Sequence, residues 1–122
     1  YRNTWLWVCA NIQQSGLPVV LLGSAAIEDF ENAPRKKLFT QIHCLALVCD
    51  DDVLRGRLMA RPEWRRSSRE PLLTNQIKWN RSLRDHFDPS EIAYDTLYTS
   101  RLNLDKTCAA VGDWVAEGLA TP

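Results

Sequence analysis

The stretch LALVCDDDVLRGRLMARPEWRRSSREPLLTNQ (residues 45–76) decides how the fold of this chain is interpreted. It begins within an apolar run, residues 43–49, which is typical of a buried strand of a parallel sheet. Aspartates follow at once, and Asp50 or Asp51 is expected to cap a helix that Pro62 ends or kinks. The stretch therefore predicts a strand that leads directly into a helix, as in α/β proteins.

The second feature of this stretch is its positive charge. Residues 55–69 contain six arginines, although the net charge of the whole chain is zero. Arg57 and Arg61 are four residues apart, so they lie on one face of the predicted helix. Ligands of open parallel sheets bind beyond the carboxyl ends of the strands, and guanidinium groups match phosphate. The pattern predicts a phosphate-bearing ligand, and the alternative is a solvated helix face paired with nearby carboxylates.

The rest of the chain alternates between helical and strand patterns. We expect helices over residues 1–15, 35–41, 51–61, 72–85 and 103–119, and strands over residues 19–23, 43–49 and 92–96. Residues 62–70 have almost no aliphatic side chains and are expected to form a mobile loop. Strands separated by helices predict right-handed crossovers and a three-layer αβα fold with a parallel sheet.

Length and composition limit the interpretation further. The 122 residues form at most one domain, and 45% of them are hydrophobic, which is enough for a core. No apolar run approaches the ~18 residues that a membrane span needs. The four cysteines have no metal-type spacing, so we predict reduced core thiols, no metal site and a cytoplasmic location. Zero net charge argues against a general nucleic-acid-binding protein.

Four stretches together resemble the C-terminal portion of P-loop kinases of the shikimate, gluconate and nucleoside-monophosphate kinase group. They are VVLLGS (19–24), LALVCDDDVLRGRLMARP (45–62), REPLLTNQ (69–76) and YDTLYTSRLNLDKTCAAVGDWV (94–115). Each motif is modest alone, and the likeness rests on their order and spacing. The resemblance implies a P-loop NTPase-like fold over residues 1–122, with a lid at about residues 60–72.

The same resemblance implies a function and a set of site residues. The intact protein would transfer a phosphoryl group from ATP to a small-molecule acceptor, with Mg²⁺ as the metal. The resemblance assigns Arg57 and Arg61 to the phosphates as catalytic residues, and Gly23 and Ser24 to the acceptor. The residues implied for ATP binding are Arg69, Tyr98, Ser100 and Arg101.

The departure from the family pattern is large, because these residues contain no GxxxxGK[ST] loop. That loop supplies backbone N–H groups and a lysine to the phosphates. We therefore expect an N-terminal segment, or a neighbouring chain, to supply the loop. The same segment or chain would supply a strand that lies, in the sheet, between the strands expected over residues 19–23 and 43–49. Alone, this fragment should be inactive. The alternatives are a non-catalytic nucleotide-binding or regulatory module that uses the basic loop for a partner, and an unrelated domain that binds an acidic protein.

Overall fold

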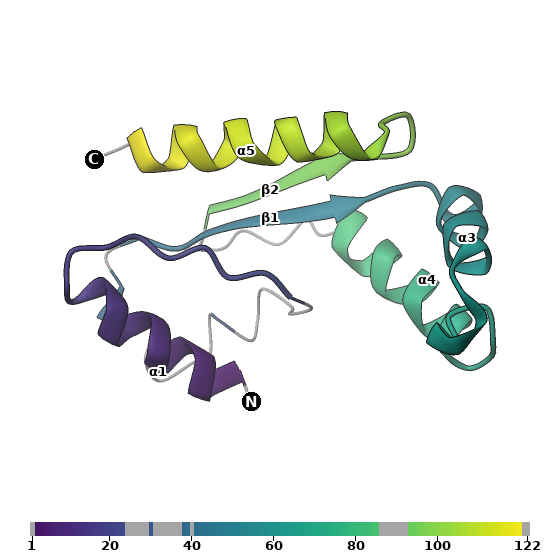
Figure 1. Cartoon of the computed structure of the whole chain (residues 1–122), viewed down its shortest axis with the longest axis horizontal. Helices are drawn as coiled ribbons and strands as arrows, with labels where there is room; N and C mark the ends of the chain where they lie inside the picture. The colour runs from purple at the N-terminus through teal and green to yellow at the C-terminus, as the bar shows by residue number, and fades with distance from the viewer. Residues whose placement is uncertain (1, 24–29, 31–37, 40, 86–92, 121–122) are drawn as a thin grey trace.

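The computed structural model describes residues 2–23, 30, 38–39, 41–85 and 93–120. Its elements are α1 (Arg2–Gln13), β1 (His43–Val48), α3 (Asp51–Ala60), the 3₁₀ helix η2 (Glu63–Arg65), α4 (Leu72–Arg84), β2 (Ala93–Tyr98) and α5 (Leu104–Ala120), drawn in Figure 1. Each agrees with a predicted element to within a few residues, except η2, which was not predicted. The helix expected over residues 35–41 falls mostly outside the described residues.

The two strands form a parallel pair, as the alternation of helices and strands predicted. The register runs from His43 opposite Ala93 to Val48 opposite Tyr98. Between the strands the chain passes through α3, η2 and α4, which gives the long crossover that a parallel pair requires. The prediction of an α/β fold with parallel strands is therefore confirmed for the two strands that the structure describes.

Helices lie on both faces of this sheet. The Tyr94 hydroxyl donates a hydrogen bond to the Leu83 carbonyl of α4 at 3.0 Å, and Trp114 Nε1 of α5 donates to Asp95 Oδ2 at 2.8 Å. Neighbouring strand residues point to opposite faces, so α4 and α5 lie on opposite sides of β2. Figure 1 shows the same arrangement, with α5 above the strands and α4 below them.

The tightest apolar packing joins the two helices of the crossover. Leu58 of α3 packs with Leu73 and Ile77 of α4, all three almost fully buried, and Leu54 packs against them. Burying such a side chain stabilises the fold by roughly 1.5–3 kcal/mol. This cluster fixes α3 against α4, and so fixes where the arginines of α3 lie.

The predicted strand over residues 19–23 is wrong for this structure. These residues form no strand, and their side chains are not buried: Val20 is 58% exposed and Leu22 is 84% exposed. An apolar run becomes a strand only where a neighbouring strand accepts and donates its ladder hydrogen bonds. No described strand pairs with residues 19–23, because the sheet contains β1 and β2 alone.

The amphipathic helices also keep apolar surface exposed. Trp5 and Ile12 of α1 and Leu104 and Leu119 of α5 are all exposed, while Leu6 and Cys9 of α1 are buried. No described helix is both long and apolar enough to cross a membrane.

Candidate functional site

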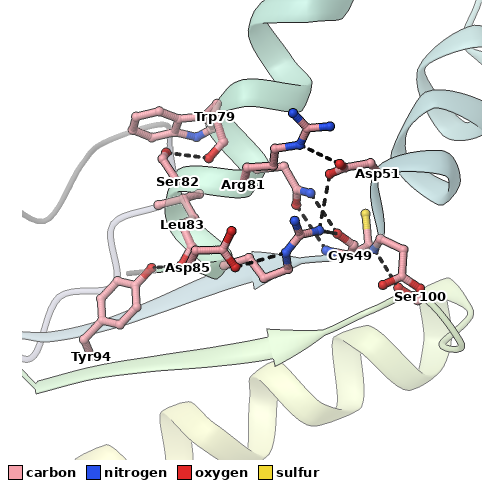
Figure 2. Close-up of polar contacts among 12 residues, drawn as sticks. Cys49, Asp51, Trp79, Arg81, Ser82, Leu83, Asp85, Tyr94 and Ser100 are labelled. Atoms are coloured by element: carbon pink, nitrogen blue, oxygen red, sulfur yellow. Dashed lines mark hydrogen bonds and ion pairs between the residues drawn. The ribbon is translucent and has the colours of Figure 1, made fainter. Parts of the chain in front are cut away.

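Polar side chains and backbone groups from four parts of the chain meet just beyond the carboxyl ends of β1 and β2. They come from α3, α4 and the turns that follow the two strands. We call this group the strand-end junction; its members are Cys49, Asp50, Asp51, Arg57, Asn80, Arg81, Arg84, Thr99 and Ser100. Part of it is drawn in Figure 2.

Asn80 of α4 holds the backbone at the end of β1. The Cys49 N–H donates to Asn80 Oδ1 at 3.1 Å, and Asn80 Nδ2 donates to the Cys49 carbonyl at 2.8 Å. Asn80 is buried, so its amide makes the hydrogen bonds to the Cys49 backbone that water would make at an exposed position. Sequence reasoning assigned Asn80 no role. A signal in the sequence could have indicated a role, because Asn80 is a polar residue on the same helix face as Leu73 and Ile77, and buried polar groups are usually hydrogen-bonded.

Arg57 joins α3 to the turn after β2. Its Nη1 donates to Thr99 Oγ1 at 2.8 Å, and its Nη2 donates to the Thr99 carbonyl at 2.6 Å. Thr99 is itself tied to β1, because its N–H and its hydroxyl both donate to the Val48 carbonyl, at 2.8 and 3.2 Å. Both acceptors of Arg57 are uncharged. In these bonds no carboxylate offsets the charge of the guanidinium, which connects three segments of the chain through neutral acceptors.

Asp51 is the charged centre of the junction. Arg81 Nε donates to Asp51 Oδ2 at 2.6 Å, and Arg84 Nη1 lies 3.3 Å from Asp51 Oδ1 and 3.2 Å from the Cys49 carbonyl. Figure 2 shows Arg81 reaching from α4 to this carboxylate. The hydrogen bond from Arg81 is the main reason why the pKa of Asp51 is lowered, and the charges of Arg81 and Arg84 act in the same direction.

The predicted cap of α3 is only partly confirmed. Asp50 occupies the N-cap position, but its side chain makes no capping hydrogen bond. Instead its backbone N–H donates to Ser100 Oγ at 2.9 Å. The hydroxyl predicted to contact ATP thus holds the start of α3 close to the turn after β2.

The basic segment (residues 60–72), expected to include a mobile loop, has local structure of its own. After Pro62 it forms η2, and Arg66 then takes the left-handed conformation, with φ of 57°. Ser67 is buried, and its hydroxyl donates to the Leu58 carbonyl at 3.0 Å. Arg69 Nη2 lies 2.7 Å from Glu63 Oε1, which adds an exposed ion pair across the segment. Local hydrogen bonds, rather than aliphatic packing, give this segment its shape.

The remaining arginines of this segment have no such partners. Arg61 is the C-cap residue of α3, and Arg65 and Arg66 follow within one short turn of chain. All three are exposed, and none has a carboxylate partner among the described residues. Arg65 instead lies over the Trp64 ring, 5.6 Å from its centroid. The arginine cluster of the sequence is thus divided between internally bonded and unpaired members.

The other predicted site residues lie apart from these arginines along the chain. Tyr98 is the last residue of β2, not part of the following loop, and its side chain is exposed. Arg101 is exposed in the turn that leads to α5. A Cβ added at Gly23 would meet no atom within 4 Å. Ser24 lies outside the described residues.

Two other kinds of chemistry find little support in the described part of the chain. Burial raises the pKa of the Cys49 thiol, which disfavours the thiolate that a nucleophile needs. Nowhere in residues 2–23, 30, 38–39, 41–85 and 93–120 do three His, Cys, Asp or Glu side chains gather closely enough to hold a metal ion. Binding by guanidinium groups is the chemistry that the arrangement favours.

Comparison of the chain with protein-family models, with curated proteins and with solved structures found no match.

Proposed function

We propose that this chain is part of an ATP-dependent kinase with a P-loop-kinase-like fold, which phosphorylates a small-molecule acceptor. The observation that carries the proposal is the set of unpaired arginines on an ordered segment: Arg61, Arg65 and Arg66 have no carboxylate partner among the described residues. Unpaired guanidinium groups bind phosphate well, because each offers several N–H donors and a fixed charge.

The order of the elements supports the same proposal. The crossover from β1 through α3, η2 and α4 to β2 is compatible with the lid that the resemblance implies between two strands. In the described sheet β1 pairs with β2 on one side only. The proposed fold would place a further strand on the other edge of β1, followed by the phosphate-binding loop. These 122 residues do not contain the GxxxxGK[ST] sequence of that loop.

The proposal gives Arg57 of α3 and Arg61 at its C-cap different tasks. Arg61 contacts the phosphates, where its charge stabilises the transferring phosphoryl group. Arg57 keeps its bonds to Thr99 and acts as a positioning residue, which holds α3 at the strand ends. The described residues offer no cluster for Mg²⁺, so none of them is assigned to the metal.

Limited proteolysis of the full-length protein tests nucleotide binding at the basic segment. Trypsin cleaves after Arg65, Arg66 and Arg69, whereas proline blocks cleavage after Arg61. We expect Mg-ATP to slow cleavage at these sites, and sodium sulfate at the same ionic strength serves as the control. Equal protection by sulfate and by ATP, or no protection by either, would contradict the proposal.

Catalysis is tested separately, by ADP formation from ATP with a panel of small hydroxyl compounds. Acceptor-dependent ADP formation supports a kinase. Protection by ATP without any such ADP formation would favour the second function that the sequence left open, a nucleotide-binding module without catalysis. The two assays therefore distinguish the two functions.

A further inference from the structure

Trp64 has the most exposed aromatic side chain among the residues that the structure describes. Its side chain is 78% exposed, on the short helix η2. Burying an aromatic side chain removes about 150–250 Å² of surface from water, so exposing one forgoes much stabilisation. Trp64 lies outside the apolar cluster of α3 and α4, and the ring contact that the structure records for it is with Arg65.

The exposure of Trp64 follows from an anchored backbone on either side of it. Leu58 lies before η2 and accepts the hydrogen bond from the buried Ser67 hydroxyl, which lies after it. The Glu63–Arg69 ion pair joins the same two sides of the turn. The turn thus has a defined shape, and this shape holds the indole in solvent.

Positive charge lies over the ring and close to it in the sequence, while the adjacent Glu63 is paired with Arg69. The Arg65 guanidinium lies over the ring, and Arg61 and Arg66 are unpaired within the described part of the chain. A ligand made of phosphate alone would use the arginines but gain nothing from the indole. A neutral aromatic ligand would use the indole but not the charges. A flat ring that carries several phosphates uses both.

We infer that Trp64 stacks on the nucleobase of the bound nucleoside triphosphate, with the arginines beside it on the phosphates. The inference rests on the proposed function and deepens it, because it names the residue that recognises the base. Stacking of a base on an aromatic side chain contributes about 1–3 kcal/mol by alanine substitution. This corresponds to a change in Kd of about fivefold to more than a hundredfold.

The test is calorimetric titration of the full-length protein with ATP and, separately, with inorganic tripolyphosphate. The variants are Trp64→Ala, Trp64→Phe and Trp5→Ala, the last being an exposed tryptophan of α1 and so a matched control. We expect Trp64→Ala to raise the Kd for ATP at least fivefold and to leave tripolyphosphate binding unchanged. Trp64→Phe should remain within about threefold of the wild-type protein, and Trp5→Ala should not differ from it.

The outcomes separate this inference from the proposed function. If the wild-type protein binds ATP and Trp64→Ala binds it equally well, base stacking is wrong while the kinase proposal stands. An equal loss for ATP and tripolyphosphate would mean that Trp64 acts only by holding Arg65, which also overturns the inference. If the wild-type protein does not bind ATP, both fail together. Because Trp64 is exposed, an unchanged Tm for each variant shows that the fold is intact.

Discussion

The strand-end junction and the basic segment use the same residue type in opposite ways. In the junction, Arg57 and Arg84 donate to backbone or side-chain acceptors within the chain. In the basic segment, Arg61 and Arg65 have no carboxylate partner among the described residues. The difference depends on where acceptors are available, because the ends of β1 and β2 leave carbonyl groups that guanidinium groups can bind. Arg57 and Arg61, four residues apart in the sequence, thus belong to different groups in space. We assign stability to the first group, and ligand binding to the arginines of the second group that have no carboxylate partner among the described residues.

The largest expected effect on stability is at Asn80. Replacing it by alanine leaves the buried Cys49 N–H without its acceptor and removes one of the two donors to the Cys49 carbonyl, which keeps Arg84 Nη1. An unsatisfied buried group costs about 1–3 kcal/mol and a lost hydrogen bond about 1 kcal/mol, so we expect a total loss of about 3 kcal/mol in the free energy of unfolding. Urea denaturation measures it. Asn75→Ala, at an exposed position of the same helix, is the control and should cost less than about 1 kcal/mol.

A smaller effect is expected at Thr99, whose hydroxyl lies between Arg57 and the Val48 carbonyl. Thr99→Val keeps the shape and removes the hydroxyl, which should cost about 1.5 kcal/mol, the typical contribution of a hydrogen bond to a charged group. The matched control is Thr96→Val, an exposed position of β2, the strand that precedes Thr99. If both variants unfold at the same urea concentration, the junction does not stabilise the fold as we describe.

The smallest effect concerns pH. The pKa of Asp51 is lowered in the folded protein, chiefly by the hydrogen bond from Arg81. The ionised carboxylate therefore favours the folded state above the ordinary aspartate pKa of about 3.9, and this stabilisation disappears as pH falls through the lowered value. Asp51→Asn should make stability less dependent on pH below about 4. An unchanged slope of stability against pH there would contradict the assignment.

The sequence predicted the elements better than it predicted the contacts between them. The helices α3 and α4 and the strand β1 follow from local signals, namely a continuous apolar run, a helical period and Pro62. The strand expected over residues 19–23 did not form, because strand formation also needs a partner strand, which an apolar run alone does not reveal.

The junction could not be predicted, because its bonds join residues far apart in the chain. The bond from Asn80 to Cys49 spans 31 residues, and the bond from Arg57 to Thr99 spans 42. The sequence around Arg57 does not reveal that its role differs from that of Arg61. The difference arises because the turn after β2 places Thr99 within hydrogen-bonding distance of Arg57. The exposure of Trp64 could not be predicted from the sequence either, because it depends on the turn that the buried Ser67 helps to shape.

Arg57→Ala and Arg61→Ala test the central claim most directly, when unfolding free energy and kinase turnover are measured on each full-length variant. We predict that Arg61→Ala changes the free energy of unfolding by less than about 1 kcal/mol. The same variant should lower kcat by orders of magnitude, a larger factor than the one by which it raises the Kd for ATP. Arg57→Ala should instead lose about 2 kcal/mol of stability, because two hydrogen bonds to Thr99 disappear. Wild-type turnover in Arg61→Ala, or wild-type stability in Arg57→Ala, would contradict the division between the two groups of arginines.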